Sequence, residues 1–177
     1  ADPGLPEMIR NGAVLTENGK IKSIGLYDDL KDHEAVLADH GLAVLMPALF
    51  NCHTHLELSY LADLGQNPPT DLTIVNWIKS LLEQRQKGCT LEEMQMAAWQ
   101  ALALLYGGGC HGVVDIGNLP ESSNLGDNFK VHVLFFLELL GLTEAKSGAA
   151  LEILSSLDHQ DELAFTAHAP YSTSAPL

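Results

Sequence analysis

The order of apolar and polar positions along this chain predicts a small hairpin followed by alternating strands and helices. Two short strand-like runs, 12–16 and 21–25, are joined across Asn18-Gly19, a pair that is typical of a hairpin turn. Longer apolar runs predict further strands at 42–50, 111–116, 130–140 and 163–167. The pattern therefore indicates a hairpin at the N-terminus and a larger sheet after it.

Helical spacing of apolar residues occurs between these predicted strands. It extends over 71–86, and Thr90 with Glu93 forms a capping box that predicts a second helix, ending at residues 107–109. A third helix is predicted over 143–157. Strands that alternate with helices are typical of a parallel α/β architecture. The chain has no stretch of 18 apolar residues, so we expect no membrane span.

Charge and cysteine content indicate which partners and which cellular location to expect for this protein. Nine Lys and Arg residues stand against 23 Asp and Glu residues, which gives a net charge of -14. Such a charge repels nucleic acid and anionic membrane surfaces, so we expect neither as a partner. The three cysteines have no C-x-x-C spacing and the N-terminus has no signal-peptide core, which predicts a cytoplasmic location.

Histidines follow two of the predicted strands. His53 and His55 end the run that begins at residue 42, and because strand side chains alternate faces, both imidazoles point the same way. Two adjacent imidazoles can share one metal ion, although nearby histidines are more often surface or capping residues. His168 follows the run at 163–167, and a parallel barrel brings such strand ends to one point. The three histidines are therefore candidate metal ligands.

The segments around these histidines resemble a known family. Residues 46–59, MPALFNCHTHLELS, resemble the first-strand signature of the amidohydrolase superfamily, and residues 168–172, HAPYS, resemble its fifth-strand signature. Both are similar to the branch of nucleoside and nucleobase deaminases and chlorohydrolases. Within that branch, residues 56–59, 75–78 and 112–116 look closest to the aminodeoxyfutalosine deaminases.

The resemblance implies an α/β fold, the N-terminal part of a (β/α)8 TIM-like barrel of the metal-dependent hydrolase type, preceded by a small β-sandwich segment. Residues 1–45 would belong to the small β-sandwich domain, and residues 46–177 would form the first half of the barrel. A complete barrel needs about 250 residues. With 177 residues in the chain, we expect a piece of a longer protein.

The same resemblance implies a metal-dependent hydrolytic deaminase, a C–N hydrolase, acting on an amino-substituted purine-like nucleoside or heterocycle. Its one divalent ion, Zn²⁺ or alternatively Fe²⁺ since imidazole suits both, would be held by His53, His55 and His168. The ion would activate water for attack on the ring carbon that bears the amino group. The family's proton-shuttling glutamate and strand-8 aspartate fall outside these 177 residues, so the catalytic residues stay unassigned.

Three further residues are candidates for the site. Glu57 would share the face of the histidines if the strand continued, which predicts a substrate contact, the alternative being a solvated loop carboxylate. Trp77 would line the substrate pocket, although a tryptophan on an amphipathic helix is more often a core residue. Glu138 lies where some superfamily members place a metal-bridging group, so it is a possible second metal ligand. A strand-end carboxylate that caps a turn is the commoner interpretation.

Two other functions stay open. A hydrolase of the same superfamily that displaces chloride or opens a cyclic amide would differ only in its pocket groups. A catalytically inactive half barrel would instead associate through its open sheet edges, and a homodimer is one form of such association. In the enzymatic interpretations the partner is a small heterocyclic substrate.

Overall fold

The computed structural model describes residues 8–66, 73–156 and 164–175 of this chain. It divides the chain into two compact units, Ala1–Leu45 and Met46–Leu177. The first unit contains a hairpin, and the second contains a parallel sheet with its helices.

The first unit is built on an antiparallel hairpin. Strand β1 (Gly12–Glu17) pairs with β2 (Lys20–Leu26), and the short helix α1 (Tyr27–Leu30) follows. Asn18 and Gly19 have positive φ values of 52° and 74°, as the two central residues of a type I′ turn require. The predicted hairpin is therefore confirmed.

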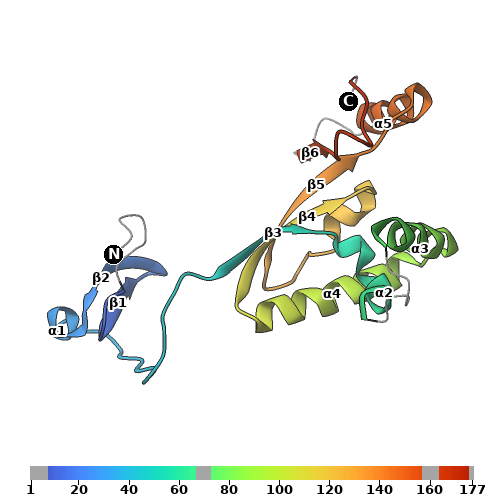
Figure 1. The fold of residues 1–177 in the computed structure, drawn as a ribbon. Coiled ribbons are helices and arrows are strands. Elements are labelled where there is room, and N and C mark those ends of the chain that lie inside the picture. Colours follow the sequence, from blue (N-terminus) through green and yellow to red (C-terminus); the bar gives the residue numbers. More distant parts are fainter. Residues whose placement is uncertain (1–7, 67–72, 157–163, 176–177) are drawn as a thin grey trace. The chain divides into compact units, whose positions relative to one another are not determined.

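The second unit is a four-stranded parallel sheet with helices between its strands (Figure 1). Its strand order is β3-β4-β5-β6, so each strand lies beside the next one along the chain. These strands are β3 (Leu49–Thr54), β4 (Cys110–Gly117), β5 (His132–Leu139) and β6 (Ala164–Ala167). Parallel strands that follow one another through helical connections are the beginning of a (β/α) barrel. The predicted α/β architecture is confirmed.

Helical segments connect these strands. They are the 3-10 helices η1 (Leu56–Leu61) and η2 (Pro120–Asn124), and the α-helices α2 (Ala62–Gln66), α3 (Ile74–Lys87), α4 (Leu91–Gly107) and α5 (Glu144–Ser156). Residues 71–72, where the sequence predicts the start of α3, lie outside the described residues. None of the helices in the described part of the chain is long and apolar enough to cross a membrane.

The predicted capping box begins α4. Thr90 Oγ1 accepts a hydrogen bond from the Glu93 amide at 3.2 Å, and Glu93 Oε2 accepts one from the Thr90 amide at 2.8 Å. These two reciprocal bonds satisfy amide groups that a helix start otherwise leaves without partners. The start of α4 is therefore fixed by residues three positions apart.

The core of this unit lies between α4, η1 and one face of the sheet. Ala98 and Leu102 of α4 pack with Leu56 of η1 and Val113 of β4, and all four side chains are fully buried. A smaller cluster joins β5 to α5. Burial of Leu56 holds η1 directly after β3, and so fixes the path of the chain just beyond His55.

Two expectations about the strands are wrong. The apolar run from residue 42 predicts a strand, but β3 begins only at Leu49, because its neighbour β4 begins opposite Leu49, at Cys110, and offers the earlier residues no strand to pair with. The segment at 168–172 resembles a fifth-strand signature, but the strand before it, β6, is the fourth strand of the parallel sheet that the described residues form. Only the pairing of the strands reveals that number.

Candidate active site

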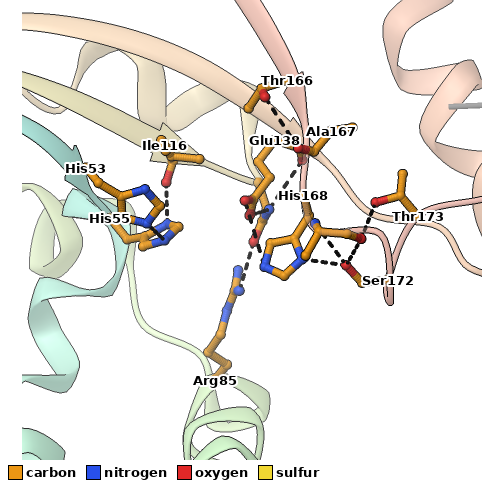
Figure 2. A network of polar contacts seen from close by, with 12 residues as sticks. His53, His55, Arg85, Ile116, Glu138, Thr166, Ala167, His168, Ser172 and Thr173 are labelled. Carbon is orange, nitrogen blue, oxygen red and sulfur yellow. Dashed lines mark hydrogen bonds and ion pairs between the residues drawn. The ribbon is translucent and has the colours of Figure 1, made fainter.

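Polar side chains gather at the carboxyl ends of the parallel strands (Figure 2). His53 and His55 lie at the end of β3, Asn118 follows β4, Glu138 lies near the end of β5, and His168 follows β6. In α/β barrels the carboxyl ends of the strands form the mouth that binds ligands. This edge of the sheet is therefore the candidate active site.

The side chains of His53 and His55, the histidine pair, converge. Their Nε2 atoms lie 3.2 Å apart, and their ring centroids lie 5.0 Å apart with an angle of 80° between the planes. Two imidazole nitrogens bound to one tetrahedral Zn²⁺, with bonds of about 2.05 Å, would lie about 3.3 Å apart. The spacing of the two nitrogens therefore fits a shared metal ion.

The main chain of β4 fixes which nitrogen of His55 can bind a metal. His55 Nδ1 lies 2.6 Å from the carbonyl oxygen of Ile116. A carbonyl oxygen only accepts, so Nδ1 carries the proton and donates it, and Nε2 keeps its lone pair. Metal-bound histidines ordinarily donate their other N–H in this way, which holds the ring in place. His55 thus has the orientation and the tautomer of a metal ligand.

The histidine pair offers two protein nitrogens. Across residues 8–66, 73–156 and 164–175, no three His, Cys, Asp or Glu side chains form a group that could hold a metal ion. A catalytic zinc ordinarily takes three protein ligands. The pair therefore fits two positions of a metal site.

His168 belongs to a separate cluster at the end of β6. Its Nδ1 contacts the hydroxyl of Ser172, and its Nε2 lies 4.0 Å from Glu138 Oε1. Strands β4 and β5 separate β6 from β3, and three strand spacings of about 4.8 Å put the two strand ends up to about 14 Å apart. The structure does not bring His168 to the histidine pair among the described residues, and its predicted role as third ligand is tested below against a contact with substrate.

Glu57 is buried, and both of its carboxylate oxygens accept hydrogen bonds. Strand β3 ends at Thr54, so Glu57 lies in η1 and not on the strand face that carries the histidines. Its Oε1 accepts from Arg85 Nη2 at 3.1 Å, and its Oε2 accepts from the Asn118 amide at 3.0 Å and the Ser122 hydroxyl at 2.9 Å. The carboxylate therefore ties the end of β3 to α3 and β4, and its contact with substrate stays a prediction.

Glu138 and Trp77 lie on different elements of the unit. Glu138 is 8% exposed, and its Oε2 accepts from Asn118 Nδ2 at 2.9 Å. Among the described residues it belongs to no group that could hold a metal ion. Trp77 is half-buried on α3. Their roles, second metal ligand and substrate contact, stay predictions.

Asp115 is a buried carboxylate of β4, opposite Thr54 in the sheet. Its Oδ1 accepts from the Leu56 amide at 2.7 Å, whereas its Oδ2 is buried and has no hydrogen-bond partner in the described part of the chain. Burial, reinforced by the nearby charge of Glu57, raises the pKa of Asp115 to about 6. Asp115 is therefore protonated in mildly acidic solution, unlike an exposed aspartate.

The chain is similar in sequence to known deaminases over part of its length. No family model matches it. Over 93 residues it is 30% identical to a 5-methylthioadenosine/S-adenosylhomocysteine deaminase of Nitratidesulfovibrio vulgaris (strain DP4), covering 51% of this chain and 20% of that protein. Over 78 residues it is 32% identical to a 5′-deoxyadenosine deaminase of Methanosarcina acetivorans, covering 44% of this chain and 16% of that protein.

A solved structure extends the similarity to the fold. Helicobacter pylori aminofutalosine deaminase, in complex with methylthio-coformycin, matches this chain with a TM-score of 0.66 and 28% sequence identity, covering 93% of this chain and 40% of that chain. Over the part they share, this chain is a homologue of the amidohydrolase deaminases. The predicted superfamily branch and fold class are confirmed. The chain spans about a fifth of the length of the curated relatives it matches.

Three polar residues of the candidate site were missed by sequence reasoning, namely Arg85, Asn118 and Ser122. Asn118 comes directly after β4, so the strand-end signal that singles out the histidines could have found it. Arg85 and Ser122 reach Glu57 across 28 and 65 positions of sequence. No local pattern carries a signal for contacts of that range.

Proposed function

We propose that this chain is part of a metal-dependent hydrolytic deaminase that removes the amino group from a purine-like nucleoside. The convergence of His53 Nε2 and His55 Nε2 at the mouth of the sheet is the observation that carries the proposal. The substrate class is supported by the relatives, because 5-methylthioadenosine, S-adenosylhomocysteine and 5′-deoxyadenosine are all adenosine derivatives.

In this proposal His53 and His55 hold a divalent ion, Zn²⁺ or alternatively Fe²⁺. Bound there, the ion supplies activated water at neutral pH for attack on the carbon that bears the amino group. The Ile116 carbonyl keeps His55 in the tautomer that leaves Nε2 free. Glu57 holds the end of β3 against β4, and with Trp77 it is proposed to shape the substrate pocket.

Ammonia release tests this function. The full-length protein that contains this chain is purified, loaded with Zn²⁺, or in parallel with Fe²⁺, and assayed with 5′-methylthioadenosine and 5′-deoxyadenosine, with chelator-treated protein as the control. We expect ammonia and the corresponding inosine derivative in equal amounts from the loaded protein only. No ammonia from either loaded form would overturn the proposal, and chloride release from a chlorinated analogue without ammonia would favour a chlorohydrolase.

Replacing His168 with alanine is expected to leave the metal content unchanged and to lower kcat/KM on the order of tenfold, the contribution of one hydrogen bond to substrate. The reason is its place at the end of β6, three strands along from the histidine pair. Metal analysis and turnover are measured on the same sample. His132→Ala, at an exposed position that begins β5, is the control. Loss of the metal would instead identify His168 as the third ligand.

A further inference from the structure

Polar contacts connect the carboxyl ends of β3, β4, β5 and β6. Glu57 after β3 accepts from Arg85 and from the Asn118 amide, and Asn118 after β4 donates to Glu138 of β5. Glu138 in turn faces His168 after β6 at 4.0 Å. Figure 2 shows Arg85 directed toward Glu138, with His168 on the other side of that carboxylate's strand end. These contacts link the strand of the histidine pair to the far side of the mouth.

Asn118 lies at the junction, because every polar atom of its side chain is in use. Its Oδ1 accepts from Arg85 Nη1 at 3.1 Å, and its Nδ2 donates to Glu138 Oε2 at 2.9 Å and to the Glu138 carbonyl at 3.3 Å. An arginine only donates and an ionised carboxylate only accepts, so the amide can point in one direction only. Asn118 thereby fixes the orientation of the Glu138 carboxylate.

Held in this way, Glu138 has one carboxylate oxygen, Oε1, that accepts no hydrogen bond from the described residues and can receive a ligand. Its Oε2 accepts from Asn118, whereas its Oε1 has His168 Nε2 at 4.0 Å, beyond hydrogen-bond length. Strand β5 lies two strand spacings, about 10 Å, from β3. Glu138 Oε1 would therefore meet a part of the substrate that is remote from the carbon above the histidine pair.

We infer that Asn118 is a positioning residue for substrate binding, which aims the free oxygen of Glu138 at the remote part of a nucleoside-like substrate. This inference rests on the proposed function. Loss of this positioning is expected to raise KM and to leave kcat unchanged, because Glu138 contacts a part of the substrate that does not react. A residue needed only for folding would reduce the number of active molecules, which lowers kcat and leaves KM unchanged.

Steady-state kinetics of Asn118→Asp, with 5′-methylthioadenosine as substrate, test the inference. Aspartate keeps the contact with Arg85 but puts a carboxylate oxygen opposite Glu138, so the two carboxylates repel and Glu138 turns away. We expect KM to rise about tenfold or more and kcat to stay within about threefold. Asn124→Asp, the same change at an exposed position of η2, is the matched control and should leave KM unchanged.

Exchanging donor and acceptor gives a second test. Asn118→Asp combined with Glu138→Gln restores a hydrogen bond between the two side chains with its direction reversed. We expect the rise in KM of the double variant to be well below the product of the two single effects. An unchanged KM in Asn118→Asp, a fall in kcat alone, or single effects that simply multiply would overturn the inference. A wild-type protein that releases no ammonia would refute the proposed function itself, and the inference with it.

Discussion

Replacing His55 with alanine is expected to remove the metal ion and to lower turnover roughly a thousandfold or more, because activation of water by a metal contributes several kcal/mol and each factor of ten in rate corresponds to about 1.4 kcal/mol. The prediction follows from the 3.2 Å between His53 Nε2 and His55 Nε2 and from the hydrogen bond that turns His55 Nδ1 toward the Ile116 carbonyl. Metal content and ammonia release, measured on the same preparation, check it.

A second substitution separates the loss of the ligand from a loss of folding. In His55→Asn the side-chain amide nitrogen lies close to the position of His55 Nδ1, so it can still donate to the Ile116 carbonyl, but it supplies no imidazole nitrogen. We expect this variant also to lose the metal, with an unfolding free energy close to that of the wild type. His132→Ala should keep both the metal and the turnover. Full metal content in both His55 variants would contradict the assignment of the pair.

Asp115→Asn is expected to raise the free energy of unfolding at pH 7.5 by up to about 3 kcal/mol. Burial raises the pKa of this carboxyl from 3.8 to about 6, a difference that corresponds to about 3 kcal/mol. The folded protein therefore binds the Asp115 proton more tightly than the unfolded chain does. This contribution to stability is fully present below about pH 3.8 and is lost as the pH rises through about 6, whereas asparagine carries no charge at any pH.

Urea unfolding at about pH 4 and pH 7.5 checks the Asp115 prediction. We expect wild type and variant to differ little at the lower pH and the variant to be the more stable at the higher pH. Asp127→Asn, the same change at an exposed position, should show the pH dependence of the wild type. Parallel pH dependence of the Asp115 variant and the wild type would show that this carboxyl does not titrate as described.

The hairpin and the order of strands and helices could be predicted because their signals are local. Asn18-Gly19 alone specifies the turn, and the start of α4 depends on Thr90 and Glu93, three positions apart. The period of two along a strand was likewise enough to put the His53 and His55 side chains together. The barrel was predicted from the resemblance of residues 46–59 and 168–172 to family signatures, and the similarity to the deaminase structure confirms this fold class.

The rest of the site depends on contacts between distant positions. Strand β3 gives way to η1 where Leu56 enters the core and its amide meets Asp115, 59 residues later, and this takes Glu57 away from the strand face. The place of His168 likewise depends on the number of strands that precede it in the sheet. The sequence next to Glu57 or His168 therefore does not predict where either side chain lies.

The partner of His55 is a main-chain carbonyl, and this makes the ring's orientation tolerant of change. Many metal-bound histidines donate their second N–H to a carboxylate side chain, and a single substitution can remove that acceptor. Here the acceptor is the backbone oxygen of position 116, which any amino acid at that position would provide while β4 keeps its place beside β3. Substitutions at position 116 would therefore leave the His55 imidazole in place, whereas a shift in the register between β3 and β4 would remove its acceptor.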